Sequence, residues 1–164
     1  MFFRYKNMII HNLVIYLVVF IFFFSFSGLR SDSLREANIK SAFLCVDNKD
    51  CLLLEIVDTP KGREYGLMGR EYLDKNKGML FLYEEPAFVK MWMLNTYIKL
   101  DMIFIRNNKI ISIMKNIEPC INMPCQSYGP ETLVDSVIEV NSGIANEKNL
   151  SIGQEINLIY SHKN

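Results

Sequence analysis

The chain has 164 residues with 18 basic and 18 acidic side chains, and its length predicts a single domain. Two of the basic residues, Arg4 and Lys6, lie in an N-terminal segment whose removal would leave a net charge of 16 − 18 = −2. No basic stripe then remains to follow a phosphate backbone, so nucleic acid is not expected as a partner.

The first 27 residues have the pattern of a signal peptide. Arg4 and Lys6 precede an apolar run at residues 13–24, which has the length of a signal-peptide core and is short for a membrane span. Small residues follow this run, and cleavage is expected after Ser27. The alternative is an uncleaved anchor, because a Phe-rich run can stay in the bilayer with some tilt.

The protein is therefore expected to be exported, to the periplasm or another extracytoplasmic compartment. Membrane contact is expected only through the N-terminal segment, and only if that segment is not cleaved. Residues 28–37 are polar and charged and predict a flexible linker. Residues 38–164 are apolar enough to bury a core and predict one β-rich domain.

All four cysteines follow the apolar run, and an even number of cysteines in an exported domain predicts disulfides. The short-range pairing joins Cys45 to Cys51 and Cys120 to Cys125. A four-residue hairpin turn would place Cys51 opposite Val46 and set the first pair diagonally. A four-thiolate zinc site is the alternative, but neither spacing is the usual two-residue knuckle, so no metal or other cofactor is expected.

The rest of the chain predicts mostly short strands. Apolar runs at 40–46 and 52–57 flank a polar turn and predict a hairpin. Thr59 before Pro60 predicts a capped helix that runs to about Met68. Further strands are predicted at 78–83, 89–93, 102–105, 109–114, 133–140 and 154–160, with turns at 84–86 and 106–108 and a short helix at 142–148 capped by Ser142.

This pattern of strands with two small helices predicts a mainly β fold, a compact antiparallel sandwich or barrel-like domain. The strands at 102–105 and 109–114 are apolar at nearly every position, so both of their faces are expected to be covered. Residues 117–131 are rich in proline and lack periodicity. A loop of that length is either functional or tied down, and a Cys120–Cys125 disulfide would staple it.

Several motifs occur in order along residues 40–160. They are Arg63, Gly66, Leu67, Met68 and Arg70; Gly78, Met79, Leu80 and Phe81; Trp92, Met93, Asn95 and Thr96; Leu100, Asp101, Met102, Ile103 and Phe104; and Glu139 and Val140. In these motifs the chain resembles the domain of unknown function 192 family. The resemblance implies a compact, mainly β fold and no particular activity, because that family has none established.

The chain departs from the family pattern at two positions. The family often has Lys where Leu94 stands and Pro where Lys99 stands, so a role for that lysine does not carry over. The loop with Cys120 and Cys125 resembles one found in a subset of the family.

Histidine is nearly missing from the predicted domain. His11 lies in the signal segment and His162 near the C-terminus. Ser-His-Asp and Cys-His catalysis need a positioned imidazole, so neither is expected, and histidine-based zinc catalysis is excluded with them. The sequence also lacks the glycine-rich loops that cradle phosphates.

Two acids lie among apolar strand residues, Asp101 and Glu139. They could form a carboxylate pair that shares acid and base work. Alternatively, each accepts hydrogen bonds from Arg63, Arg70 or loop backbone and supports the fold. The structural interpretation is favoured, because buried acids are usually paired.

Trp92 could form an aromatic platform for a sugar or peptide, although a Trp between Met91 and Met93 is more often a core residue. Asn95 and Thr96 could bind a ligand through their amide and hydroxyl groups, or could simply form a turn.

Arg63 and Arg70 could form an anion site, or could pair with Glu64, Glu71 or Asp101. The polar, charged and aromatic candidates all occur within the family motifs, so together they form the candidate binding patch. Its members are Arg63, Arg70, Trp92, Asn95, Thr96, Asp101 and Glu139.

Three functions follow from these observations. The favoured one is a binding or accessory module of the cell envelope, whose partner is a small molecule, a peptide or an envelope protein. The second is a carboxylate-dependent hydrolase, which requires Asp101 and Glu139 to lie on the same side of the fold. The third is a purely structural or assembly protein, for which Trp92 and Asn95 should both be buried with no pocket beside them.

Overall fold

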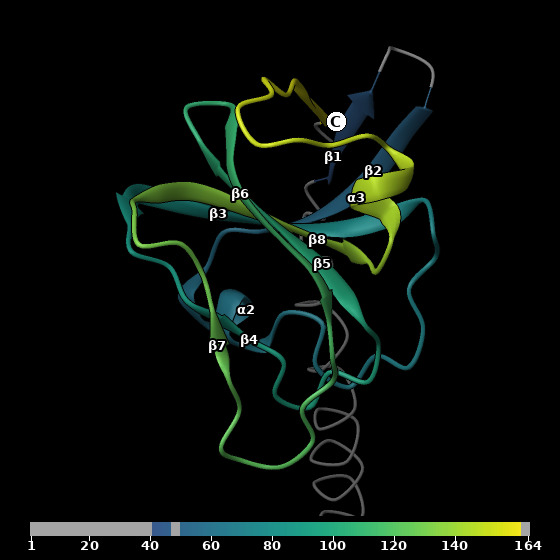
Figure 1. The fold of residues 1–164 in the computed structure, drawn as a ribbon, viewed down its shortest axis with the longest axis vertical. Coiled ribbons are helices and arrows are strands. Elements are labelled where there is room, and N and C mark those ends of the chain that lie inside the picture. The colour runs from purple at the N-terminus through teal and green to yellow at the C-terminus, as the bar shows by residue number, and fades with distance from the viewer. Residues whose placement is uncertain (1–40, 47–49, 162–164) are drawn as a thin grey trace, which may run out of the picture. The chain divides into compact units, whose positions relative to one another are not determined.

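The structure is a computed structural model that describes residues 41–46 and 50–161. These residues belong to one compact unit, Ile39–Asn164. Within them, a seven-stranded mixed sheet is accompanied by a two-stranded sheet and two short helices (Figure 1). The predicted signal peptide, its cleavage site and the linker lie outside the described residues.

The main sheet has the strand order β6-β5-β8-β3-β2-β1-β9. Its strands are β1 (Ser41–Val46), β2 (Asp50–Val57), β3 (Lys77–Ala87), β5 (Leu100–Arg106), β6 (Lys109–Ile117), β8 (Val134–Asn141) and β9 (Leu158–Ser161). The remaining elements are β4 (Met91–Trp92), which pairs with β7 (Ser127–Tyr128), and the helices α2 (Pro60–Tyr65) and α3 (Ile144–Glu147).

The predicted mainly β, sandwich-like domain is confirmed. The pairing of β2 with β3 is parallel, so the main sheet is mixed rather than wholly antiparallel. The strands of the described region do not close into a barrel. No helix in this region is long and apolar enough to cross a bilayer.

The first hairpin has a different register from the one expected. Val46 pairs with Asp50, which leaves a three-residue connection at 47–49 instead of four residues. Cys45 therefore lies directly opposite Cys51 and not diagonal to it, and the two form a disulfide with a Cα–Cα distance of 4.0 Å. The predicted pairing is confirmed, and the diagonal placement was wrong because the turn is one residue shorter.

Helix α2 begins where the sequence predicts and ends earlier. The Thr59 hydroxyl accepts a hydrogen bond from the Gly62 N–H at 3.1 Å, and Pro60 occupies the first turn. The helix ends at Tyr65 rather than near Met68, because Gly66 has a φ of 47°. A positive φ stops the right-handed helix, and glycine adopts it without a Cβ clash.

Strand β3 continues through the predicted turn at 84–86. The ladder between β3 and β8 is irregular between Leu82 and Ala87, and Pro86 lies within that irregular stretch. A proline has no N–H to donate, so a strand tolerates it where regular pairing is interrupted. Conversely, β4 has two residues instead of the five predicted at 89–93.

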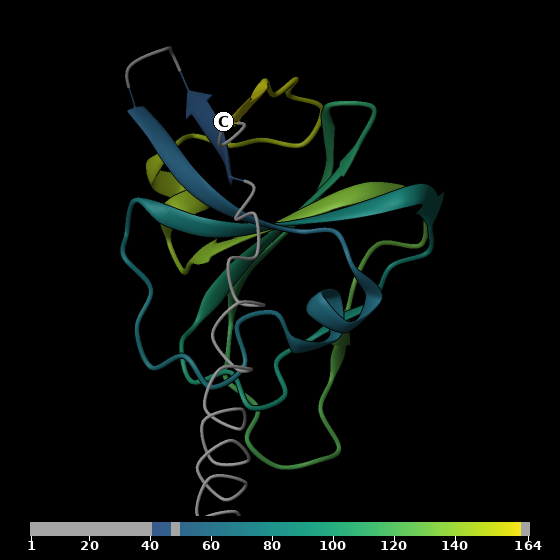
Figure 2. The same cartoon turned by 180° about the vertical axis from the view of Figure 1, so that it is seen from behind.

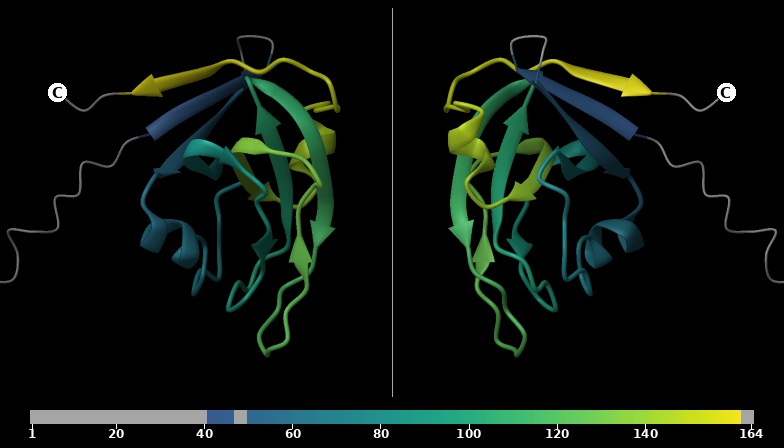
Figure 3. Two further views of the ribbon diagram at one scale, coloured as in Figure 1. Left: turned by 90° about the vertical axis from the view of Figure 1, so that its left-hand side faces the viewer. Right: turned by 90° about the vertical axis from the view of Figure 1, so that its right-hand side faces the viewer.

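The main sheet has a core on each face. One core packs with α3 and includes Leu80, Ile103 and Ile138; the other includes Phe81 and Phe104. Helices α2 and α3 accordingly lie on opposite sides of the sheet (Figure 3). In Figure 2, α2 and the β4–β7 pair are seen below the main sheet.

Strand β5 is covered on both faces as predicted, with six of its seven residues buried. Strand β6 is not. It lies at one edge of the sheet, and its only buried residues are Ile110 and Ile117. The apolar composition of β6 did not distinguish an edge strand from a central one.

Candidate functional site

A groove lies between α2 and the chain that continues from β4. Its volume is about 580 Å³, and it is open to solvent. The residues that line it are Thr59, Lys61, Gly62, Glu64, Tyr65, Met68, Trp92 and Leu94. The two aromatic side chains are partly solvent-exposed, Tyr65 at 64% and Trp92 at 38%, so the groove presents accessible ring surface.

A small recess adjoins this groove and shares five lining residues with it. Its volume is about 20 Å³, enough for one water-sized group. Beyond the shared residues, it is lined by Arg63, Gly66, Leu67, Phe81, Met91, Thr96 and Glu139. The recess thus connects solvent-exposed aromatic rings to a carboxyl group that belongs to the sheet.

That carboxyl group is Glu139 on β8. Its Cα partners in the neighbouring strands are Met79 and Met102, and its residue surface is 3% exposed. No hydrogen bond or ion pair joins its carboxyl group to another described residue. Burial among apolar neighbours raises the pKa of Glu139 to about 8, so the group is mostly protonated at neutral pH.

Arg63 lines the same recess but is held by backbone. Its Nη1 atom donates hydrogen bonds to the carbonyl oxygens of Asp58 at 2.7 Å and Leu82 at 2.8 Å. Its guanidinium carbon lies 4.9 Å from the ring centroid of Tyr83, within the range of a cation–π contact. Arg63 therefore fastens the entry to α2 onto β3, and the ion pair expected for it with Glu64, Glu71 or Asp101 is not formed.

Tyr83 interacts electrostatically with both Arg63 and Glu139. Burial raises the pKa of the Tyr83 phenol, while the nearby Arg63 charge lowers it and Glu139 raises it. Its hydroxyl donates to the Met91 sulfur at 3.7 Å. The phenol therefore stays neutral over the physiological range.

Arg70 does not belong to this site. Its guanidinium makes two hydrogen bonds to the Glu55 carboxylate, at 2.7 Å and 2.5 Å. The hydrogen bond from Arg70 lowers the pKa of Glu55. The predicted ion pair of Arg70 exists, but its partner is on β2 and is none of the three acids expected.

Asp101 is fully buried and has a structural role. Its Oδ1 accepts a hydrogen bond from the N–H of Asn116 at 2.9 Å. Its Oδ2 accepts from the N–H groups of Gly143 at 2.9 Å and Ala145 at 3.0 Å, and so caps the start of α3. The predicted cap, Ser142, instead donates its hydroxyl to the Asn116 side chain.

Asp101 and Glu139 lie on opposite faces of the sheet. Met102 pairs with Glu139, and Asp101 pairs with Val140. Because successive side chains in a strand point to opposite faces, the two carboxyl groups cannot meet. The predicted hydrolase needs both acids on the same side of the fold. Asp101 is paired with Val140, the residue next to Glu139, so the two acids are on opposite sides and this mechanism is ruled out.

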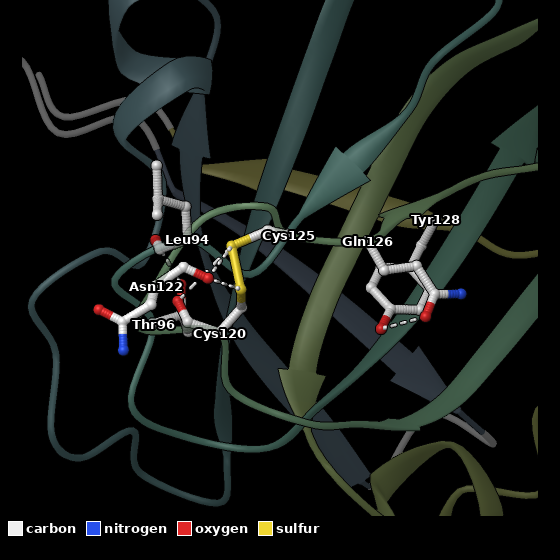
Figure 4. The surroundings of a disulfide bond; sticks show 7 residues. All are labelled: Leu94, Thr96, Cys120, Asn122, Cys125, Gln126 and Tyr128. Atoms are coloured by element: carbon white, nitrogen blue, oxygen red, sulfur yellow. Dashed lines mark hydrogen bonds between the residues drawn. A yellow bond between two sulfur atoms is a disulfide. The ribbon is translucent and has the colours of Figure 1, made fainter.

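Asn95 and Thr96 lie in a turn that a disulfide loop supports. Asn95 has a φ of 53°, and its N–H donates to the Cys120 carbonyl at 2.8 Å. The Cys120 N–H donates in turn to the Met93 carbonyl at 3.2 Å. The predicted Cys120–Cys125 disulfide is present, with Cα atoms 5.9 Å apart, and lies beside Leu94 and Thr96 (Figure 4). The staple therefore supports one wall of the groove.

The candidate patch is thus divided by the fold. Arg63, Trp92, Thr96 and Glu139 meet around the recess, while Arg70, Asn95 and Asp101 do not line it or the groove. Trp92 and Asn95 are both exposed and a groove adjoins Trp92, which is contrary to what a purely structural protein predicts.

Sequence reasoning missed the groove residues Tyr65, Met68 and Leu94. Tyr65 could have been predicted as a surface residue, because it is an aromatic residue at the end of a short polar helix. Nothing in the sequence placed Leu94 beside that helix.

No three acidic, histidine or cysteine side chains converge on a metal-sized site within the described residues. The four cysteines form two disulfides, so the alternative four-thiolate zinc site is not formed.

Comparison with known proteins agrees with this architecture. Two solved structures share the fold, each with a TM-score of 0.62. One, from Sinorhizobium meliloti, is described as a candidate transcription regulator; it is 32% identical, and the match covers 72% of this chain and 92% of that one. The other, from Novosphingobium aromaticivorans, is described as a protein of unknown function; it is 25% identical, and the match covers 71% and 83%. Among curated proteins, no match was found.

The model of the domain of unknown function 192 family, described as an uncharacterised family, matches residues 43–158. This match spans both disulfides, the groove and the recess. It also includes every residue of the candidate patch. The chain therefore belongs to the domain of unknown function 192 family.

Proposed function

We propose that this chain is an exported domain of the cell envelope that binds a small molecule or a short peptide in the groove beside Trp92. The observation that carries the proposal is the continuity of the groove with the recess at Glu139. Ligand sites are typically apolar clefts with a few polar groups, and a buried acid with a perturbed pKa in such a cleft marks a functional candidate.

Export is supported by two independent features of the chain. The N-terminal 27 residues have the pattern of a signal peptide. Two disulfides are consistent with an oxidising compartment, because cytosolic thiols are normally kept reduced. Both features suit a periplasmic or other extracytoplasmic location.

Nucleic acid is a poor partner for this groove. The Sinorhizobium protein is described as a candidate transcription regulator, but the groove of this chain has no cluster of basic side chains. The groove contains one basic and one acidic side chain, Lys61 and Glu64, and the chain without its first 27 residues has a net charge of −2. Phosphate backbones are bound by clustered positive charge.

The fluorescence of Trp92 tests the proposal directly, because it is the chain's only tryptophan and lines the groove. Purified full chain would be titrated with envelope sugars, tripeptides and simple anions, with Trp92 emission and melting temperature as readouts. At least one class should shift both. A complete lack of shifts, with no envelope protein captured either, would overturn the proposal.

A matched pair of variants locates the binding. Tyr65→Ala removes an aromatic side chain of the groove, and affinity for any ligand found should fall about tenfold. Tyr72→Ala removes a tyrosine that is also largely exposed but does not line the groove, and it should leave the affinity unchanged. If the two variants change the ligand affinity by the same amount, the ligand does not bind in the groove.

A further inference from the structure

The recess has room for only one water-sized group. Its volume is about 20 Å³, close to what a single water molecule needs. An ammonium group fits this space. A guanidinium or a trimethylammonium group, each built from several heavy atoms, does not. Size alone therefore limits what the end of a ligand can be.

The chemistry of the recess selects among the groups that fit. Glu139 lines it and has no partner among the described residues, although it is 97% buried by residue surface. A buried acid without a partner lowers the stability of the folded state, and a bound ligand that pairs with the acid would offset this cost. Thr96 also lines the recess and offers a hydroxyl oxygen. Oxygen acceptors favour a ligand with several N–H donors.

The groove outside the recess suits an aliphatic chain. Met68 and Leu94 are apolar, and the rings of Tyr65 and Trp92 are exposed beside them. Aromatic faces attract cations as well as alkyl surface. A straight chain lying here would direct its end into the recess, since both spaces share these four residues.

Deepening the proposed function on which it rests, we propose that the recess receives the terminal ammonium of an aliphatic primary amine, with the alkyl chain lying in the groove against Trp92. The carboxyl group of Glu139 gives up its proton to solvent, and the resulting carboxylate pairs with the entering ammonium. One proton is released for each amine bound, and no covalent bond to the ligand forms or breaks.

The other ionisable groups around the recess do not prevent this pairing. From α2 they are Arg63, Glu64 and Tyr65, and from β3 Tyr83; β4 and β5 present Trp92 and Met102, which do not ionise. Arg63 is the only cation among them. Its Nη1 is bound to two carbonyl oxygens and its guanidinium faces the Tyr83 ring, so its charge is already engaged.

Calorimetry with n-pentylamine on the full chain tests this assignment. The titration is run at pH 7 in two buffers that differ in ionisation enthalpy and are not primary amines. Because a group with a pKa of about 8 is about nine-tenths protonated at pH 7, close to one proton should be released per amine. The affinity should rise about tenfold from pH 6 to pH 7, since ionisation of the acid is part of binding.

Two neutral or oversized probes supply the comparison. Pentan-1-ol and n-pentyltrimethylammonium should each bind at least about tenfold more weakly than n-pentylamine, because one lacks the charge and the other cannot enter the recess. Ala-Lys-Ala and 1,5-diaminopentane distinguish the sources of the amine. Binding of the tripeptide points to a lysine side chain, and binding of the diamine alone points to a free amine.

A pair of variants assigns the effect to one carboxyl group. Glu139→Gln should lose amine affinity about tenfold or more and abolish proton release. Glu71→Gln removes an exposed acid that lines neither the recess nor the groove, and it should leave the affinity unchanged. Unchanged amine binding in Glu139→Gln, or pentanol binding as tightly as the amine, would overturn the amine assignment and leave the groove as a binding site. If the envelope sugars, tripeptides and anions also fail to bind and no envelope protein is captured, the proposed function fails as well. The pH dependence measured on the unaltered chain decides the question should Glu139→Gln not fold.

Discussion

Replacing Glu139 by Gln should stabilise the protein, and increasingly so as the pH rises. Burial raises the pKa of Glu139 from 4.5 to about 8. The folded state therefore holds a proton that the unfolded state releases, and the free energy of unfolding falls as the pH rises between these two values. Gln is close to Glu in shape and never ionises, so the variant should lack this loss.

The size of the effect follows from the two pKa values. At pH 5 the ionisation of Glu139 in the unfolded chain favours unfolding by about 1 kcal/mol, and at pH 7 by about 3 kcal/mol. Above pH 8 the penalty no longer grows. The Glu139→Gln variant should thus gain about 2 kcal/mol more over the unaltered chain at pH 7 than at pH 5.

Urea denaturation followed by Trp92 emission measures the difference at both pH values. Glu64→Gln serves as the control, because Glu64 is exposed. Its stability should follow that of the unaltered chain at both pH values. The reasoning is refuted if Glu139→Gln differs from the unaltered chain by the same free energy of unfolding at pH 5 and at pH 7. That result would mean that Glu139 has the same pKa in the folded and the unfolded state.

Four further outcomes are expected. Asp101→Asn should destabilise the domain by about 3 kcal/mol in urea titrations, because an amide cannot accept all three backbone hydrogen bonds made by the carboxylate; a loss under about 1 kcal/mol would contradict its structural role. Arg70→Ala should cost less than about 1 kcal/mol in the same assay, because its ion pair is about one-third exposed; a larger loss would argue for a role beyond that pair. Cys120→Ser should cost about 2 kcal/mol and speed hydrogen exchange at Asn95 without unfolding the domain; free, alkylatable thiols in unreduced protein would contradict the disulfide itself. The exported protein should begin at Gly28 by intact mass, and a mass that retains residues 13–24 would indicate an anchor instead.

Local patterns predicted most of the elements. The strand pairs at β1–β2 and β5–β6 were evident from apolar runs around polar turns. Asn107 and Asn108 adopt positive φ values in the turn between β5 and β6. The start of α2 was visible in Thr59 and Pro60. Each of these features depends on residues that are close together in sequence, so their physical causes are present in the sequence itself.

The sequence by itself indicated most of the strands, the start of α2, the short-range disulfide pairing as the favoured one, and the family. The tertiary structure decided which candidate residues share a site. Asp101 and Glu139 looked equivalent in sequence, yet the register of β5 against β8 sends one to α3 and the other to the recess. The alternation of side chains along a strand is a local property. Which side of the sheet each side chain reaches depends on the pairing with distant strands, because a register shift of one residue would move every side chain to the other face. That is why the recess, which gathers side chains from α2, β3, β4 and β8, could not be assembled from sequence alone.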